Sequence, residues 1–216
     1  MSRKVFFYIG FFVVLAIGFY FAMTQVIPGF GDVKLPVVQR VKPFSFTNQD
    51  GERVTERTVE GKVYVAEYFF TTCPSICPQL NSNMLKIYEE FKNEPAFMIL
   101  SHTVDPDNDT VGRLKWYADS LKVNTKQWEF LTGRKDSLYM TARNSYVLDD
   151  PQNNLQNINE QFLHTQFFAL VDRIGRVRKI YDGLKKEEIE ELKKDIKKLL
   201  REHNPGERFS NNLFGS

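Results

Sequence analysis

Hydrophobic positions along the chain form strand-like runs and helical stripes. Residues 63–70 are a run of β-branched and aromatic residues without turn formers, a pattern typical of a central strand buried on both faces, and residues 96–104 are a second expected buried strand. Apolar residues at helical spacing predict three amphipathic helices. Their stripes are Cys77, Leu80, Met84, Ile87 and Phe91; Val111, Leu114, Ala118 and Leu121; and Ile189, Leu192, Ile196 and Leu199. The expected N-cap of the second helix is Thr110 or Asp109.

A hairpin is expected near the C-terminal end. Residues 166–172 and 177–183 resemble two strands, and residues 173–176 join them with Gly175 at the turn. Strands and helices that alternate and then end in a hairpin plus a helix predict an α/β domain with a mixed central sheet flanked by helices.

The first residues have a different character. Residues 5–23 form an uncharged apolar run of 19 residues, which as a helix spans about 28 Å, close to the hydrocarbon core of a bilayer. Arg3 and Lys4 precede it, so the N-terminus is expected in the cytoplasm and the remainder across the membrane. A cleaved signal peptide is the alternative, but the run is long for one and no A-x-A site follows.

The type of membrane anchor indicates the cellular compartment of the soluble domain. No cysteine ends the run, which excludes a lipoprotein anchor, and no Arg/Ser-rich transit peptide is present. We therefore expect a single-pass protein of a bacterial inner membrane with its soluble domain in the periplasm. Thiols there tend to oxidise, so any function as free thiols requires a reductant.

The chain divides into four expected segments. Residues 1–23 are the anchor, 24–36 a linker rich in Pro and Gly, 37–203 the α/β domain and 204–216 a disordered tail. The net charge is only +2, and no basic block is interleaved with aromatics, so a nucleic-acid partner is not expected.

Both cysteines lie in "TTCPSICP", which follows the first buried run and opens the first predicted helix. Backbone N–H groups at a helix N-terminus stabilise negative charge, so we expect a lowered cysteine pKa there. Positions i and i+4 share a helix face, which lets Cys73 and Cys77 chelate a metal or close a disulfide. A structural disulfide, or Cys77 as an ordinary core residue, remains an alternative.

A metal bound by two thiolates needs further ligands, and three histidines are available. Thiolates suit Cu(I), zinc or iron–sulfur centres. His203 lies near the C-terminus and is a poor candidate, whereas His164 directly precedes the first hairpin strand. Two thiolates and one imidazole fit Cu(I) better than structural zinc, which normally takes four protein ligands. An ordinary surface or core histidine is the alternative for His164.

Three further features raise questions about the site. His102 lies near the end of the second run and could supply a fourth ligand or a hydrogen bond to a ligand, or could simply be hydrogen-bonded at a strand end. Asp105, Asp107 and Asp109 lack the glycine and glutamate of a calcium loop, so we expect them to cap a helix and order a loop beside the site. For Glu67 we favour exposure on one sheet face over a group with raised pKa near the thiols.

Several segments together resemble the SCO/SenC family of cytochrome c oxidase assembly proteins. They are "TTCPSICPQL", "TVDPDNDT", "WEFLTG", "FLHTQFFALVD" and "GRVRKIYDG", in the family's order over roughly residues 44–200. The resemblance implies a thioredoxin-like fold in which Cys73, Cys77 and His164 bind copper, as Cu(I) or Cu(II). Ser75 and Ile76 stand between the cysteines, where family members often carry an acidic residue.

The resemblance also implies a role in metallating the dinuclear copper site of oxidase subunit II. One hypothesis is a copper chaperone that receives copper from an upstream donor. A second is a thiol:disulfide oxidoreductase that uses only Cys73 and Cys77, although C-x-x-x-C departs from the C-x-x-C of thioredoxins. A peroxidase-like activity is a third, with little support because no isolated peroxidatic cysteine is present.

Overall fold

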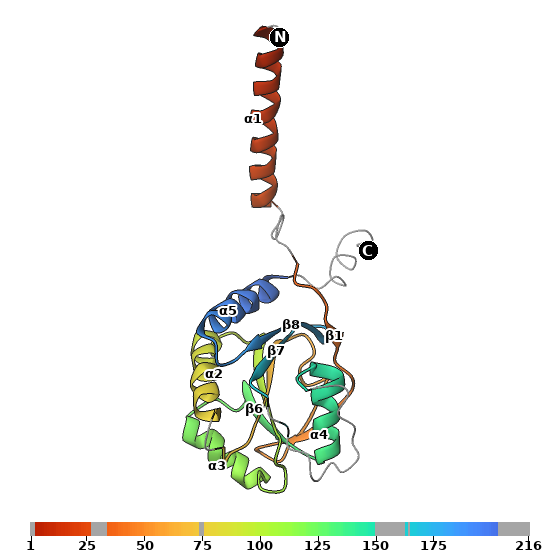
Figure 1. Cartoon of the computed structure of the whole chain (residues 1–216), viewed down its shortest axis with the longest axis vertical. Helices are drawn as coiled ribbons and strands as arrows, with labels where there is room; N and C mark the ends of the chain where they lie inside the picture. Colours follow the sequence, from red (N-terminus) through yellow and green to blue (C-terminus); the bar gives the residue numbers. More distant parts are fainter. Residues whose placement is uncertain (1–2, 27–33, 74–75, 150–162, 164, 203–216) are drawn as a thin grey trace, which may run out of the picture. The chain divides into compact units, whose positions relative to one another are not determined.

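The computed structural model describes residues 3–26, 34–73, 76–149, 163 and 165–202 (Figure 1). The chain forms two compact units, Met1–Lys34 and Leu35–Ser216. In the first unit, helix α1 covers Arg3–Val26, and its segment Arg3–Met23 is long and apolar enough to cross a membrane by length and composition. The helix therefore extends beyond the predicted run 5–23, and residues 24–26, expected in the linker, are helical.

The second unit contains an eight-stranded sheet in the order β1-β8-β7-β4-β5-β6-β2-β3. The strands β4, β5 and β6 are parallel, and every other neighbouring pair is antiparallel. The mixed central sheet is thus confirmed. The strands are β1 Gln39–Arg40, β2 Ser45–Asn48, β3 Arg53–Thr55, β4 Val63–Phe69, β5 Phe97–Thr103, β6 Trp128–Thr132, β7 Phe167–Val171 and β8 Arg176–Asp182.

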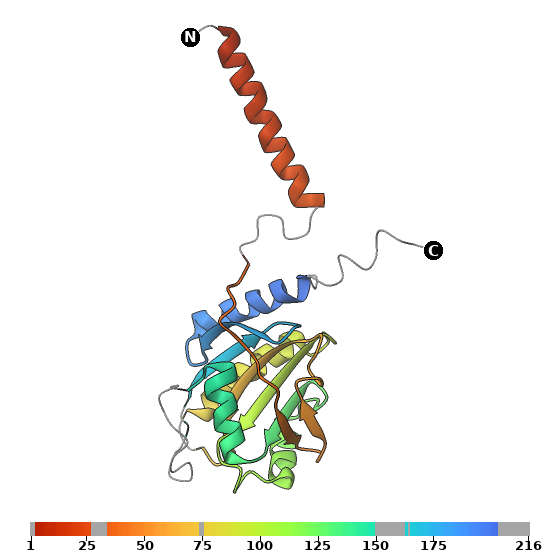
Figure 2. The ribbon, with the colours of Figure 1, turned by 90° about the vertical axis from the view of Figure 1, so that its right-hand side faces the viewer.

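Helices cover both faces of this sheet, as Figure 1 shows. They are α2 Cys77–Phe91, α3 Val111–Leu121, α4 Lys135–Thr141, the π-helix η1 Ala142–Tyr146 and α5 Lys186–Arg201. The helices α2, α3 and α5 lie on one face, and α4 lies on the other, where Figure 2 shows it across the sheet. The thioredoxin-like arrangement expected from the sequence is confirmed.

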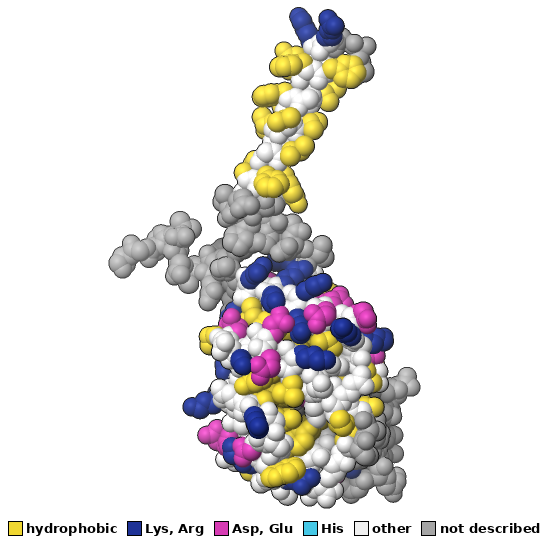
Figure 3. Space-filling model, turned by 90° about the vertical axis from the view of Figure 1, so that its left-hand side faces the viewer, with side chains coloured by type: hydrophobic (Ala, Val, Ile, Leu, Met, Phe, Trp, Pro, Cys, Tyr) yellow, Lys and Arg dark blue, Asp and Glu magenta, His cyan; other side chains and the backbone are white. Residues whose placement is uncertain are grey.

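Apolar packing, an N-cap and a glycine turn account for the elements that the sequence predicted. The apolar stripes of α2, α3 and α5 pack on the sheet, and the outer face seen in Figure 3 carries basic and acidic side chains gathered towards α5. The Thr110 side chain caps α3 by accepting a hydrogen bond from the Arg113 N–H (3.4 Å). Gly175 turns the β7–β8 hairpin at φ +74°, a left-handed conformation that glycine adopts readily.

The two faces of the sheet bury separate cores, because alternate residues of a strand point to opposite faces. In β4, Val63, Val65 and Phe69 pack with α2, α3 and α5, whereas Tyr64, Ala66 and Tyr68 pack with α4 and η1. All seven residues of β4 are buried, as are all seven of β5. The prediction of two central strands buried on both faces is therefore confirmed.

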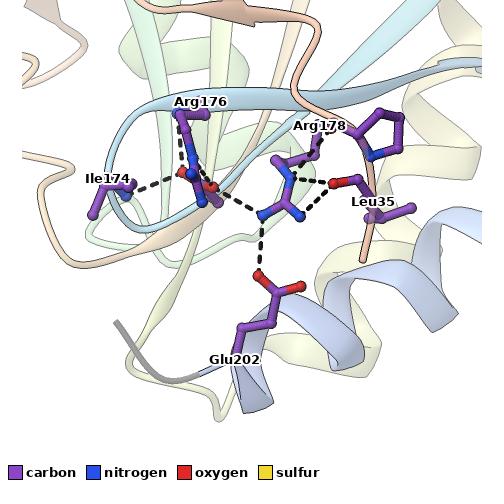
Figure 4. Close-up of polar contacts among 7 residues, drawn as sticks. Leu35, Ile174, Arg176, Arg178 and Glu202 are labelled. Carbon is purple, nitrogen blue, oxygen red and sulfur yellow. Dashed lines mark hydrogen bonds and ion pairs between the residues drawn. The ribbon is translucent and has the colours of Figure 1, made fainter. Parts of the chain in front are cut away.

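A buried arginine fastens both ends of the domain to β8 (Figure 4). Arg178 is 2% exposed and donates to the Leu35 carbonyl oxygen (2.5 Å from Nη2), to Asp172 Oδ2 (3.0 Å) and to Glu202 Oε2 (3.0 Å). Leu35 belongs to the predicted linker and Glu202 follows α5. The last residues of that linker are thus fixed to the domain by hydrogen bonds to a charged group, which are among the stronger ones in proteins.

Candidate functional site

Both cysteines lie where β4 gives way to α2. The Cys73 N–H donates to the Phe70 carbonyl (3.3 Å), and Cys77 is the first residue of α2. Both are thiols; Cys73 is half-buried and Cys77 is buried. The two thiols lie within hydrogen-bonding reach of each other. One ligand or one disulfide can therefore engage both sulfurs.

The pKa of Cys77 differs from the sequence expectation. Burial raises the pKa of this thiol to about 12, the neighbouring Cys73 thiol and the charge of Glu67 add to the effect, and a hydrogen bond from the backbone of Phe70 opposes it. The prediction that the helix N-terminus lowers the pKa is wrong for Cys77, because desolvation outweighs the helix field. Cys77 holds its proton at neutral pH until a metal or a partner displaces it.

A buried carboxylate holds the segment that leads to Cys73. Asp109 is fully buried, and its oxygens accept hydrogen bonds from the Thr71 hydroxyl (2.5 Å), the Thr71 N–H (3.2 Å) and the Thr103 hydroxyl (2.5 Å). Arg113 Nε also donates to Thr71 Oγ1 (3.0 Å). The residues before Cys73 are thereby tied to the end of β5 and to the start of α3.

Asp105 orders the loop between β5 and α3. Its carbonyl accepts from the Asp109 N–H (2.9 Å), its carboxylate accepts from Asn108 Nδ2 (2.8 Å), and its own N–H donates to Thr103 Oγ1 (2.9 Å). The expectation that the aspartates order a loop is confirmed for Asp105 and Asp109. The cap of α3 itself is Thr110.

Glu67 corrects a sequence interpretation. Its side chain is 1% exposed, so the favoured reading of an exposed glutamate is wrong. Burial raises the pKa of its carboxyl to about 7, and a hydrogen bond from the Ser101 hydroxyl (2.5 Å) partly opposes the shift. Trp128 Nε1 in turn donates to Ser101 Oγ (2.8 Å). Glu67 alternates with Val65 and Phe69 on the α2 side of β4, where its charge acts on the Cys77 thiol.

His102 lies on the other face of the sheet from α2. Its ring stacks on Tyr68 (centroids 5.0 Å apart) and meets Phe46 edge-on (5.5 Å). Burial lowers its pKa to about 4, and within the described residues neither ring nitrogen makes a hydrogen bond of standard geometry to a side chain. The structure does not bring His102 together with Cys77.

His164, Ser75 and His203 lie outside the described residues. Among the residues that the structure describes, no three His, Cys, Asp or Glu side chains are grouped as a metal site. The residue before His164 is described: Leu163 is buried, and its N–H donates to the hydroxyl of Tyr139 (3.1 Å). The ligand set Cys73, Cys77 and His164 stays a prediction.

Sequence reasoning missed the residues that support the site from a distance. Tyr139 and Ser101 lie outside the recognised motifs, and nothing local assigns a role to Thr71 within "TTCPSICP"; each acts through a hydrogen bond to a residue far away in the chain. Only the aspartates were noticed, because three of them alternate before α3. Nothing in the local pattern marks Tyr139.

The chain is similar to known proteins over most of its length. The SCO1/SenC family model matches residues 36–201. The "SCO1 protein homolog" of Bacillus subtilis is 32% identical over 169 residues, which cover 76% of this chain and 85% of that protein.

Two solved structures extend the comparison. BsSco, described as a member of the Sco family of cytochrome c oxidase assembly proteins with a disulfide switch, has a TM-score of 0.66 and 31% identity over 77% of this chain and 96% of its own. Arabidopsis thaliana ScoI, crystallised with copper bound, has a TM-score of 0.57 and 24% identity over 75% of this chain and 98% of its own, and shows the fold. With a family model that spans the whole sheet and its helices, this chain belongs to the SCO1/SenC family.

Proposed function

We propose that this chain is a membrane-anchored, extracytoplasmic copper chaperone. It binds one copper ion through Cys73, Cys77 and His164 and delivers it to the dinuclear copper site of cytochrome c oxidase subunit II. The observation that carries the proposal is the pair of adjacent thiols at the β4–α2 junction. Copper-bound Sco relatives with the same fold support the choice of metal.

The thiol pair fits copper as cargo. Two soft sulfur donors and an imidazole satisfy Cu(I), which accepts low coordination numbers. Binding displaces the Cys77 proton, because the metal takes the thiolate and not the thiol. Since the pKa of Cys77 is raised to about 12, copper affinity increases with pH through the neutral range.

The N-terminal helix supports the location. Helix α1 is long enough to cross a bilayer, and Arg3 and Lys4 at its start favour a cytoplasmic N-terminus. The domain would then lie in the periplasm. A thiol reductant or an upstream copper donor must act there, because unpaired thiols in that compartment tend to oxidise.

A copper titration tests the ligand set. The reduced full-length chain in detergent should bind one Cu(I), and His164→Ala should lower the affinity by about tenfold or more, since losing one metal ligand costs upward of about 1.4 kcal/mol. His203→Ala is the matched control, also a histidine-to-alanine change, and should bind as the unsubstituted chain does. Equal affinities of the His164→Ala and His203→Ala variants would contradict the proposal.

A thiol:disulfide oxidoreductase is the second candidate, favoured by the thiol pair and by the disulfide switch of BsSco. Cys73, the more exposed thiol, would attack a partner disulfide as the thiolate, and Cys77 would resolve the mixed disulfide. The partner gains two electrons and two protons and becomes a dithiol, while Cys73 and Cys77 form a disulfide. Partner reduction that survives His164→Ala but not Cys73→Ser would favour this function.

A further inference from the structure

Tyr139 is a buried phenol on α4, on the face of the sheet opposite α2. It is 0% exposed and packs in the second core together with Leu138, Leu148, Leu163 and Val104. Because this core is closed, the phenol hydroxyl can find partners only among neighbouring protein groups. The role of Tyr139 therefore depends on the groups to which its hydroxyl is hydrogen-bonded.

The hydroxyl joins two segments that are far apart in the chain. It accepts a hydrogen bond from the Leu163 N–H (3.1 Å) and donates one to the Val104 carbonyl (3.1 Å). The Val104 N–H in turn donates to the Phe69 carbonyl (2.9 Å) at the end of β4. Leu163 directly precedes His164, and Phe69 lies four residues before Cys73. Tyr139 therefore links the chain before the histidine to the strand ends that lead to the thiols.

We propose that Tyr139 is a positioning residue for copper binding: its hydroxyl fixes Leu163, and with it the start of the histidine segment, to the ends of β4 and β5. The inference rests on the proposed function and concerns how His164 is presented to the metal. Tyr139 itself does not touch copper.

The physical reason is the demand of a buried backbone N–H for a partner. Without the hydroxyl, the Leu163 N–H loses its acceptor, and a buried donor without a partner costs about 1–3 kcal/mol. We expect Leu163 to leave its present position to relieve that cost. A ligand held in place in only a fraction of molecules lowers the apparent affinity for the metal by that fraction.

The test compares two tyrosines in the same core. Tyr139→Phe in the reduced full-length chain should lower Cu(I) affinity about tenfold in competition with a Cu(I) chelator. Tyr68→Phe is the matched control, because the Tyr68 hydroxyl is also buried and also bonded to a backbone carbonyl, that of Leu138 (2.9 Å), but does not contact Leu163. Tyr68→Phe should leave the affinity unchanged.

A double variant separates positioning from general loosening. Because Tyr139 acts through His164, adding Tyr139→Phe to His164→Ala should cause no further loss of affinity, whereas effects of independent sites add. The absorption spectrum of the Cu(II) form should also shift in Tyr139→Phe towards that of His164→Ala.

The outcomes are distinct. An unchanged affinity in Tyr139→Phe, an equal loss in Tyr68→Phe, or an additive loss in the double variant would each overturn the role of Tyr139 alone. An unchanged affinity in His164→Ala would overturn the proposed ligand set and this inference with it. A loss of Cu(I) affinity in Tyr139→Phe that is absent in Tyr68→Phe, and that adds nothing in the double variant with His164→Ala, supports both the ligand set and the role of Tyr139.

Discussion

Glu67 places a carboxyl inside the hydrophobic core beside the β4–α2 junction. Ser101 donates to it, and Trp128 donates to Ser101, so one oxygen is held in a short chain of hydrogen bonds. Within the described residues the other oxygen, Oε2, has no hydrogen-bond partner. Burial of an incompletely paired carboxyl favours its neutral form, which explains its raised pKa of about 7.

This burial predicts a pH-dependent stability. An unfolded glutamate loses its proton near pH 4.3, whereas the folded one keeps it to about pH 7. The folded state binds the extra proton in that window, so the free energy of unfolding falls as pH rises through it, by about 3 kcal/mol in total. Glu67→Gln, which cannot ionise, should be more stable than the unsubstituted chain at pH 8 by about 2–3 kcal/mol.

Urea unfolding at pH 5 and at pH 8 measures this difference. The advantage of Glu67→Gln should grow by about 2–3 kcal/mol between pH 5 and pH 8. Glu129→Gln is the control for copper binding. Burial also raises the pKa of Glu129 to about 7, but Glu129 lies in β6 and not beside the thiols. Copper affinity should therefore change in Glu67→Gln and not in Glu129→Gln. A stability advantage of Glu67→Gln that does not grow with pH would refute the account of this carboxyl.

The residues show where reading the sequence worked and where it failed. Residues 63–70 were correctly predicted as a strand buried on both faces, and such a strand leaves no exposed face for Glu67, so the two interpretations were inconsistent. Cys73 and Cys77 could be located because their chemistry and spacing are local. The roles of Tyr139 and Thr71 depend on contacts between distant segments, which periodicity does not encode.

Among the elements, α2 is fixed to the sheet by a close approach at Gly183, just after β8. The Asn83 side chain donates to the Gly183 carbonyl (2.8 Å). A methyl group on Gly183 would lie 2.7 Å from Leu80 Cδ2, 2.7 Å from Phe168 Cζ and 2.8 Å from the Gln166 carbonyl oxygen. The first half of α2, which carries Cys77, depends on that space.

Gly183→Ala should therefore destabilise the domain by about 1–3 kcal/mol, the usual cost of overpacking a core. Gly112→Ala is the matched control, since a methyl group there meets nothing within 4 Å and the residue lies in helix α3. That change should stabilise by about 0.5–1 kcal/mol, because alanine has the higher helix propensity. Thermal unfolding of both variants measures the contrast, and a neutral Gly183→Ala would show that this contact is loose.

Long elements were predictable from sequence and short ones were not. The helices α2, α3 and α5 and the strands β4 and β5 have enough residues to display a period. The two-residue strand β1 exists because it pairs with β8, and β2 pairs with β6 and β3. The helices α4 and η1 were missed as well, although α4 carries Tyr139.

At the scale of the whole molecule, the chain combines an apolar N-terminal helix with a SCO1/SenC domain. The helix begins with Arg3 and Lys4 and extends to Val26, and the second unit begins with Leu35, whose carbonyl accepts a hydrogen bond from Arg178. The family match and the thiol pair are the observations on which the proposed copper function rests.

The central claim is that this chain holds copper with two sulfurs and one imidazole nitrogen. X-ray absorption spectroscopy of the copper-loaded, reduced full-length chain counts these ligands directly. We expect two sulfur ligands and one nitrogen ligand, with the nitrogen lost in His164→Ala and both sulfurs lost in the Cys73→Ser, Cys77→Ser double variant. A copper centre with the same ligands in the unsubstituted chain and in His164→Ala, or one without sulfur, would contradict the account.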